Sequence, residues 1–74
     1  MYIRSQNKSF LGKVEVVNIH QTKSSKMWQI NGIIGHDNFF LGEYQDEERA
    51  KRVIEDIQAH IVNYDRFVYN MPKE

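Results

Sequence analysis

The sequence contains no cysteine and a single proline, and these shortages limit how the chain can be stabilised. Without cysteine, disulfide bonds and thiolate zinc sites are both excluded. A chain of 74 residues builds one small core with little margin of stability, and chains of this size commonly gain margin by self-association. We therefore predict one domain over residues 1–74, stabilised by close packing or by oligomerisation.

Long hydrophobic runs and an excess of one charge are missing as well. No segment approaches the ~20 apolar residues of a membrane span, and the first residues form no apolar signal core. We therefore expect a cytoplasmic protein with no membrane partner. Ten basic and ten acidic residues cancel, whereas dedicated nucleic-acid binders are usually basic overall. A basic loop, Lys23–Lys26 with Lys8 and Lys13, keeps nucleic-acid binding as a disfavoured alternative.

The clearest pattern in the sequence is an amphipathic helix over residues 46–63. Asp46 is a suitable N-cap, and Glu47 and Glu48 place negative charge in the first turn, where the helix dipole favours it. Apolar residues then recur at steps of three and four, as expected for one buried stripe: Ala50, Val53, Ile54, Ile57 and Ile61. Two i,i+4 ion pairs are expected on the exposed face, Glu47 with Lys51 and Glu48 with Arg52.

Residues 1–45 predict a small antiparallel β-meander of about four strands. Strand-like segments lie near residues 2–5, 14–20, 27–34 and 38–44, with turn-forming residues between them. Phe10 and Leu11 can add a short strand before Gly12. Residues 64–74 predict a C-terminal strand or arm that ends at Pro72. The expected fold class is α+β: a β-meander, one amphipathic helix and a short C-terminal strand.

The predicted strands carry apolar residues on both faces. By the two-residue period of a strand, Val14 and Val16 share one face, and Leu41 lies opposite Phe40 and Tyr44. One helix covers one face of a small sheet, so the second face needs its own cover. We expect a homo-oligomer, most simply a dimer, with a tightly rolled sheet closed by the tail as the alternative.

The sequence shows no pattern that indicates catalysis, a cofactor or a metal. It has no Gly-x-Ser-x-Gly nucleophile elbow, and Gly32-Ile33-Ile34-Gly35 lacks the spacing of a dinucleotide-binding loop. Asp56 and His60 are four residues apart on the predicted helix, a spacing more typical of a solvated contact than of a metal site. We therefore expect a protein that is not an enzyme.

Two groups of residues are candidates for binding. Cationic and amide side chains with one indole could hold the phosphate and base of a nucleotide: Arg4, Gln6, Lys8, Trp28 and Arg49. Aromatic residues of the tail could anchor a protein partner: Tyr64, Phe67 and Tyr69. Arg4 lies on the strand face opposite Ile3, so it needs a partner of its own. The candidates are Glu43, a second subunit or a bound anion.

Three short stretches resemble a known group of proteins. They are Ile3-Arg4-Ser5-Gln6-Asn7-Lys8, Leu41-Gly42-Glu43-Tyr44 and Asp46-Glu47-Glu48-Arg49-Ala50. This pattern resembles a group of short proteins from Gram-positive bacteria and their phages, in which Leu-Gly-x-Tyr runs into Glu-Glu-Arg-Ala on a helix. The resemblance implies a phage- or mobile-element-type accessory protein that acts by binding, with inhibition of a bacterial defence system as one such role. Its expected partner is a host protein.

Overall fold

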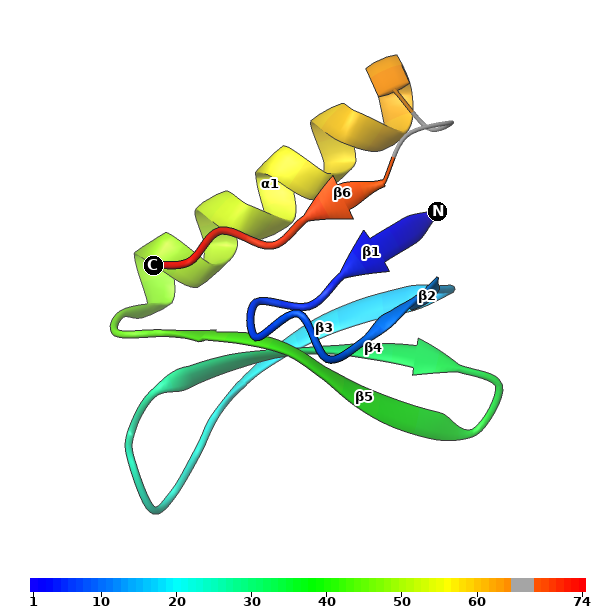
Figure 1. Cartoon of the computed structure of the whole chain (residues 1–74). Coiled ribbons are helices and arrows are strands. Elements are labelled where there is room, and N and C mark those ends of the chain that lie inside the picture. Colours follow the sequence, from blue (N-terminus) through cyan, green and yellow to red (C-terminus); the bar gives the residue numbers. More distant parts are fainter. Residues whose placement is uncertain (65–67) are drawn as a thin grey trace.

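The computed structural model contains two three-stranded sheets and one helix, and it describes residues 1–64 and 68–74. Strands β3 (Val16–Gln21), β4 (Trp28–Ile34) and β5 (Asp37–Tyr44) form an antiparallel meander. Helix α1 (Glu47–Tyr64) lies across one face of this meander (Figure 1). The predicted α+β class is confirmed.

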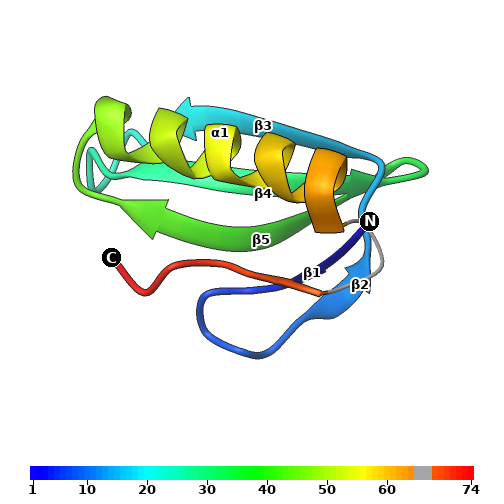
Figure 2. The same cartoon turned by 90° about the horizontal axis from the view of Figure 1, so that it is seen from above.

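The second sheet joins the two ends of the chain. Strand β1 (Tyr2–Arg4) pairs antiparallel with β2 (Leu11–Lys13) and parallel with β6 (Tyr69–Asn70). The first predicted strand is therefore not part of the meander, and it pairs with the C-terminal strand instead. Figure 2 shows β1 and the C-terminal segment on the β5 side of the molecule, and in Figure 1 both lie between the level of β5 and that of α1.

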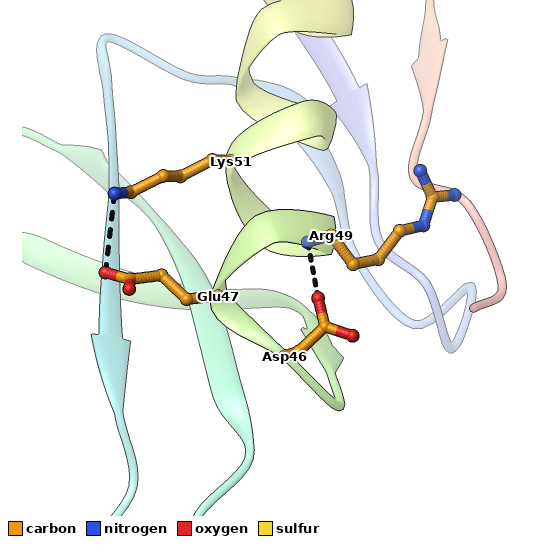
Figure 3. Close-up of polar contacts among 4 residues, drawn as sticks. All are labelled: Asp46, Glu47, Arg49 and Lys51. Atoms are coloured by element: carbon orange, nitrogen blue, oxygen red, sulfur yellow. Dashed lines mark hydrogen bonds and ion pairs between the residues drawn. The ribbon is translucent and has the colours of Figure 1, made fainter.

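The helix begins as the sequence predicts, one residue after its cap. Asp46 Oδ1 accepts a hydrogen bond from the Arg49 main-chain N–H at 2.8 Å, which satisfies a donor that the helix leaves free. Of the two expected ion pairs, Lys51 and Glu47 lie 3.5 Å apart (Figure 3), and the contacts of the described residues do not include Glu48 with Arg52. An exposed pair of this kind adds about 0.3–0.5 kcal/mol.

The core lies between α1 and the two sheets. Ala50, Val53 and Ile57 form the buried stripe of the helix. They pack against a fully buried set from the strands: Ile3, Ile30, Leu41 and Tyr44. Burying an aliphatic side chain of this size stabilises the fold by about 1.5–3 kcal/mol, so the stripe holds the helix on the sheet.

The expectation of two apolar faces is wrong in detail, because a β-bulge changes the side-chain order in β5. The register shifts between Ile30 and Asn31, and Leu41 and Tyr44 are consequently both buried on the helix side. Val14 is buried whereas Val16 is 52% exposed, because Val14 precedes β3 and lies outside its alternation. The outer face of the meander is therefore mainly polar: Asn18, His20, Gln29, Asn31, Asn38 and Glu43, with Val16, Ile33 and Phe40.

Candidate functional site

The polar stretch after β1 is a turn closed by its own side chains. Ser5 is fully buried, and its hydroxyl donates to Asn7 Oδ1 at 2.8 Å and accepts the Phe10 main-chain N–H at 3.0 Å. Asn7 Oδ1 also accepts from the N–H and the hydroxyl of Ser9 at 3.1 and 2.7 Å. These bonds satisfy a buried hydroxyl and two main-chain donors, so the turn is a structural element.

Arg4 completes this turn and does not pair with Glu43. Its Nε and Nη2 donate to the main-chain oxygen of Lys8 at 3.1 and 3.0 Å. Lys8 has a φ of +67°, a left-handed conformation that is unfavourable for a residue with a side chain. The two-pronged contact from Arg4 holds this residue in place. Lys8 therefore belongs to the turn geometry rather than to a convergent set of cationic side chains.

Gln6 lies at the centre of a clamp between the β5 edge and the C-terminal segment. Its main-chain N–H donates to Leu41 O at 2.6 Å, and its Oε1 accepts from the Glu43 N–H at 3.0 Å. Its Nε2 donates to Glu43 O at 3.2 Å, to Pro72 O at 3.1 Å and to Lys73 O at 2.7 Å. The Gln6 side-chain amide thus forms hydrogen bonds with the main chain of β5 in the way a neighbouring strand would. It also forms hydrogen bonds with the main chain of the C-terminal segment. We call these contacts the Gln6 clamp.

Gly42 allows Gln6 to lie this close to β5. A Cβ atom at Gly42 would lie 3.3 Å from Gln6 Cβ and 3.0 Å from Tyr44 Oη. Both distances are shorter than ordinary carbon contacts, so a larger residue would push the clamp away from the strand. The Leu41-Gly42-Glu43-Tyr44 stretch and the Gln6 stretch, far apart in sequence, are therefore two halves of one contact.

Tyr44 and Arg49 bind the same tail from the other side. The Tyr44 hydroxyl donates to Pro72 O at 2.8 Å. Arg49 Nε and Nη2 donate to the main-chain oxygen of Glu74 at 3.1 and 2.8 Å. The guanidinium carbon lies 5.8 Å from the centre of the Tyr44 ring, close enough for a cation–π contact. Figure 3 shows the Arg49 guanidinium beside the C-terminal segment.

A cleft of about 580 Å³ lies beside the clamp, between the end of β5, the start of α1 and the tail. Its lining mixes both signs of charge: Glu43, Asp46, Glu48, Arg49, Arg52 and Lys73 among others. Gln6 and Arg49 line it, but their donors are directed at main-chain oxygens of the protein itself. The cleft therefore lacks the concentration of free positive charge that a phosphate group needs.

Two tyrosines near the clamp have raised pKa values. Burial, and next the charge of Tyr69, raise the pKa of Tyr44 from 10.0 to about 12, although Arg49 lowers it. Burial, and next the charge of Asp56, raise the pKa of Tyr69 to about 12 as well, again against Arg49. Both phenols keep their protons at neutral pH, so the Tyr44 hydroxyl stays a donor to Pro72.

The aromatic candidates do not form one surface in the described part of the chain. Trp28 is half-buried at the start of β4 and packs against the core. The Tyr69 ring also packs inward, 5.4 Å from the His60 ring in an edge-to-face contact. Phe67 and the side chain of Tyr64 lie outside the described residues. Arg4, Gln6, Lys8 and Arg49 fall in two places, the turn and the clamp.

The outer face of the β2-β1-β6 sheet carries an exposed apolar patch that the sequence did not indicate. Tyr2, Leu11 and Val68 are 52%, 53% and 42% exposed. The register places Tyr2 and Leu11 on one face, opposite the buried Ile3, and Val68 directly precedes β6 of the same sheet. We call these three side chains the outer patch. Alternation around Ile3 was the available signal for Tyr2, whereas Leu11 lies on the same face only through the pairing of β1 with β2.

Comparison with known proteins gives no match to this chain by family model, by sequence among curated proteins or by fold among solved structures. Within residues 1–64 and 68–74, no three His, Asp or Glu side chains are grouped as a metal site would need. None of the helices described is both long and apolar enough to cross a membrane. The functional conclusion therefore depends on the chain's own surfaces.

Proposed function

We propose that this chain is a small non-enzymatic accessory protein that acts by binding another protein through the outer patch. The observation that carries this proposal is the exposure of Tyr2 and Leu11 on one face of a small sheet, with the exposed Val68 directly before β6 of that sheet. Burying apolar surface is favourable by about 25 cal/mol per Å², and large side chains gathered on a surface are typical of interaction sites. Tyrosine in particular is enriched in such interfaces.

The charges on the same face indicate the chemistry of the partner. Lys13 lies opposite Tyr2 in the register and Arg4 lies opposite Leu11, so both cationic side chains alternate with the apolar ones. Residues 1–26 carry five basic side chains against one acidic residue. The expected partner surface is apolar with carboxylates at its rim, because complementary charge steers association and fixes register.

The resemblance to short proteins of Gram-positive bacteria and their phages supports a more specific proposal. We place the protein in the cytoplasm of a bacterial host, where its partner would be a component of a host defence system that it inhibits. This step rests on analogy, whereas the outer patch rests on exposure and register.

The alternative of a nucleotide binder has less support. Its cationic candidates, Arg4 and Arg49, each direct two donors at a main-chain oxygen, and the Gln6 amide is used in the clamp. A phosphate would have to compete with these contacts before it gained any of its own.

The proposal is tested by affinity capture from lysate of a Gram-positive host, followed by measurement of the dissociation constant with the purified captured protein. Leu11→Lys and Tyr2→Lys should each weaken this complex about tenfold or more, since they place charge in the centre of the patch. Asn38→Lys, an exposed change on the other sheet, is the matched control and should leave the affinity unchanged. Unchanged affinity of both patch variants would overturn the assignment.

A further inference from the structure

Strand β3 forms an open edge of the meander. The sheet order is β3-β4-β5, and within the described residues no strand pairs with the far side of β3. Figure 2 shows β3 at the border of the molecule, with α1 above the sheet. An edge strand presents unpaired main-chain N–H and C=O groups, which favour pairing with another strand.

The sequence of β3 lacks the features that normally protect such an edge. Val16–Gln21 reads Val-Val-Asn-Ile-His-Gln, with no lysine, no acidic residue and no proline. Proteins usually place a charge or a proline on an edge strand to prevent pairing, or keep it very short. At six residues this strand is as long as an average strand, and it is rich in β-branched residues.

A groove of about 200 Å³ with a mostly apolar lining lies between the chain start, the beginning of β3 and α1. Its lining comes from the chain start, from the segment leading into β3 and from the helix: Met1, Ile3, Val14, Glu15, Val17, Ile54, Ile57, Gln58 and Ile61. Ile61 is 49% exposed although it belongs to the apolar stripe of α1. The groove meets the open edge at Val17, the one β3 residue in its lining.

We propose that β3 pairs antiparallel with β3 of a second copy of this chain, about a twofold axis that passes through Asn18. In this register Val17 faces Ile19 of the other copy on the helix side, twice by symmetry. On the outer side Asn18 faces Asn18, and Val16 faces His20. The two meanders join into one six-stranded sheet.

A second copy fits this edge because the strand is complementary to itself. A twofold axis makes each contact occur twice, and no like charges face each other in this register because β3 has no charged residue. Stable interfaces bury about 800 Å² on each partner, more than one short strand edge offers. The exposed Val16 and the Val17 side chain at the groove add apolar area beside the edge, and the neutral net charge of the chain favours self-association.

The experiment is a charge-complementation test of oligomeric state by analytical ultracentrifugation over a concentration series. The wild type should sediment as a dimer. Asn18→Lys and Asn18→Asp each place two like charges on the axis, so each should raise the dimer dissociation constant roughly tenfold or more. An equimolar mixture of the two variants should restore the dimer, because opposite charges then face each other. Asn38→Lys, the same change on the same outer face away from β3, is the matched control.

Each outcome decides the proposal. A wild type that stays monomeric at every concentration overturns it, as does a dimer that Asn18→Lys leaves as stable as the control. Failure of the mixture to restore the dimer overturns the Asn18-centred register. Far-ultraviolet circular dichroism of the monomeric variants should match the wild type, since Asn18 is exposed. The outer patch lies on the other sheet, so this result is independent of the affinity measurements above.

Discussion

The two edges of the meander are completed in different ways. At the β5 edge, the Gln6 main chain and side chain form hydrogen bonds with Leu41 and Glu43, so this one residue takes the place of a neighbouring strand. At the β3 edge, no described strand takes this position, and the strand carries no charge or proline. The comparison shows that a single residue can cover a sheet edge within one chain through its main chain and its side-chain amide, whereas an open edge favours pairing with a second chain.

The two edges also contribute to different properties of the protein: the β5 edge to folding stability and the β3 edge to association. The closed edge depends on contacts 37, 66 and 67 residues apart in sequence, so it forms only when the N-terminal turn and the tail are both in place. The open edge belongs to the β3–β4 hairpin, whose paired residues are close in sequence. Damage to the first edge should therefore lower the stability of the chain, and damage to the second should alter its oligomeric state.

The largest effect is expected from breaking the closed edge at Gln6. Gln6→Ala removes the side-chain bonds to Glu43, Pro72 and Lys73 and leaves these main-chain groups without that partner. The free energy of unfolding should fall by about 3 kcal/mol, since each lost bond costs about 0.5–1.5 kcal/mol. Urea denaturation followed by circular dichroism measures it.

A second glutamine is the matched control, because its loss shows how much the free energy of unfolding changes when a glutamine outside the clamp is replaced. Gln58→Ala, on the exposed face of α1, should change the free energy of unfolding by less than about 0.5 kcal/mol. Gln6→Glu should destabilise at least as much as Gln6→Ala at neutral pH. A carboxylate oxygen, which only accepts hydrogen bonds, would then face the carbonyl oxygens of Pro72 and Lys73 to which Nε2 donates. Equal stability of Gln6→Ala and the control would show that the clamp contributes little.

A smaller effect is expected from the pH dependence of the same region. The pKa values of Tyr44 and Tyr69 are raised from 10.0 to about 12 in the fold, so the folded state keeps protons that the unfolded state releases. Their contribution to stability is fully present below pH 10 and is lost as the pH rises towards 12. Thermal unfolding midpoints should therefore fall steeply across this window.

Tyr44→Phe sharpens this prediction because it removes one of the two titrating groups. It should flatten the decline between pH 10 and pH 12, and at pH 7 it should cost about 1 kcal/mol for the lost bond to Pro72. Tyr2→Phe, at a half-exposed ring, is the control at pH 7 and should have little effect. A decline just as steep in Tyr44→Phe would contradict the assignment to this phenol.

The smallest effect is expected at Arg49. Arg49→Lys keeps the positive charge but loses the two-pronged contact with the Glu74 main-chain oxygen, because an ammonium group lacks the planar fork of a guanidinium. Stability should fall by about 0.5–1 kcal/mol, and amide hydrogen exchange of residues 71–74 should become faster. Arg52→Lys, exposed on the next turn, should change neither. Unaltered exchange in the tail of Arg49→Lys would show that this contact does not hold it.

The local elements were predictable because their signals lie within a few residues. Asp46, Glu47 and the apolar stripe fix the start and face of α1, and the turn residues separate the strands of the meander. The second face was mispredicted because a β-bulge at the β5 pairing reverses the side-chain order, and strict alternation cannot anticipate a bulge. The candidate cations were separated in the structure because Arg4 and Arg49 bind different main-chain oxygens.

The sequence by itself determined the fold class, the helix and the polar turn after the first strand, because each follows from hydrophobic period, capping or short-range side-chain bonds. Only the tertiary structure decided the partner of Gln6, the pairing of β1 with β6, and which edge of the meander is closed. These contacts join residues from opposite ends of the chain. No local pattern encodes them, since they form only once the core has brought both ends to the same side of β5.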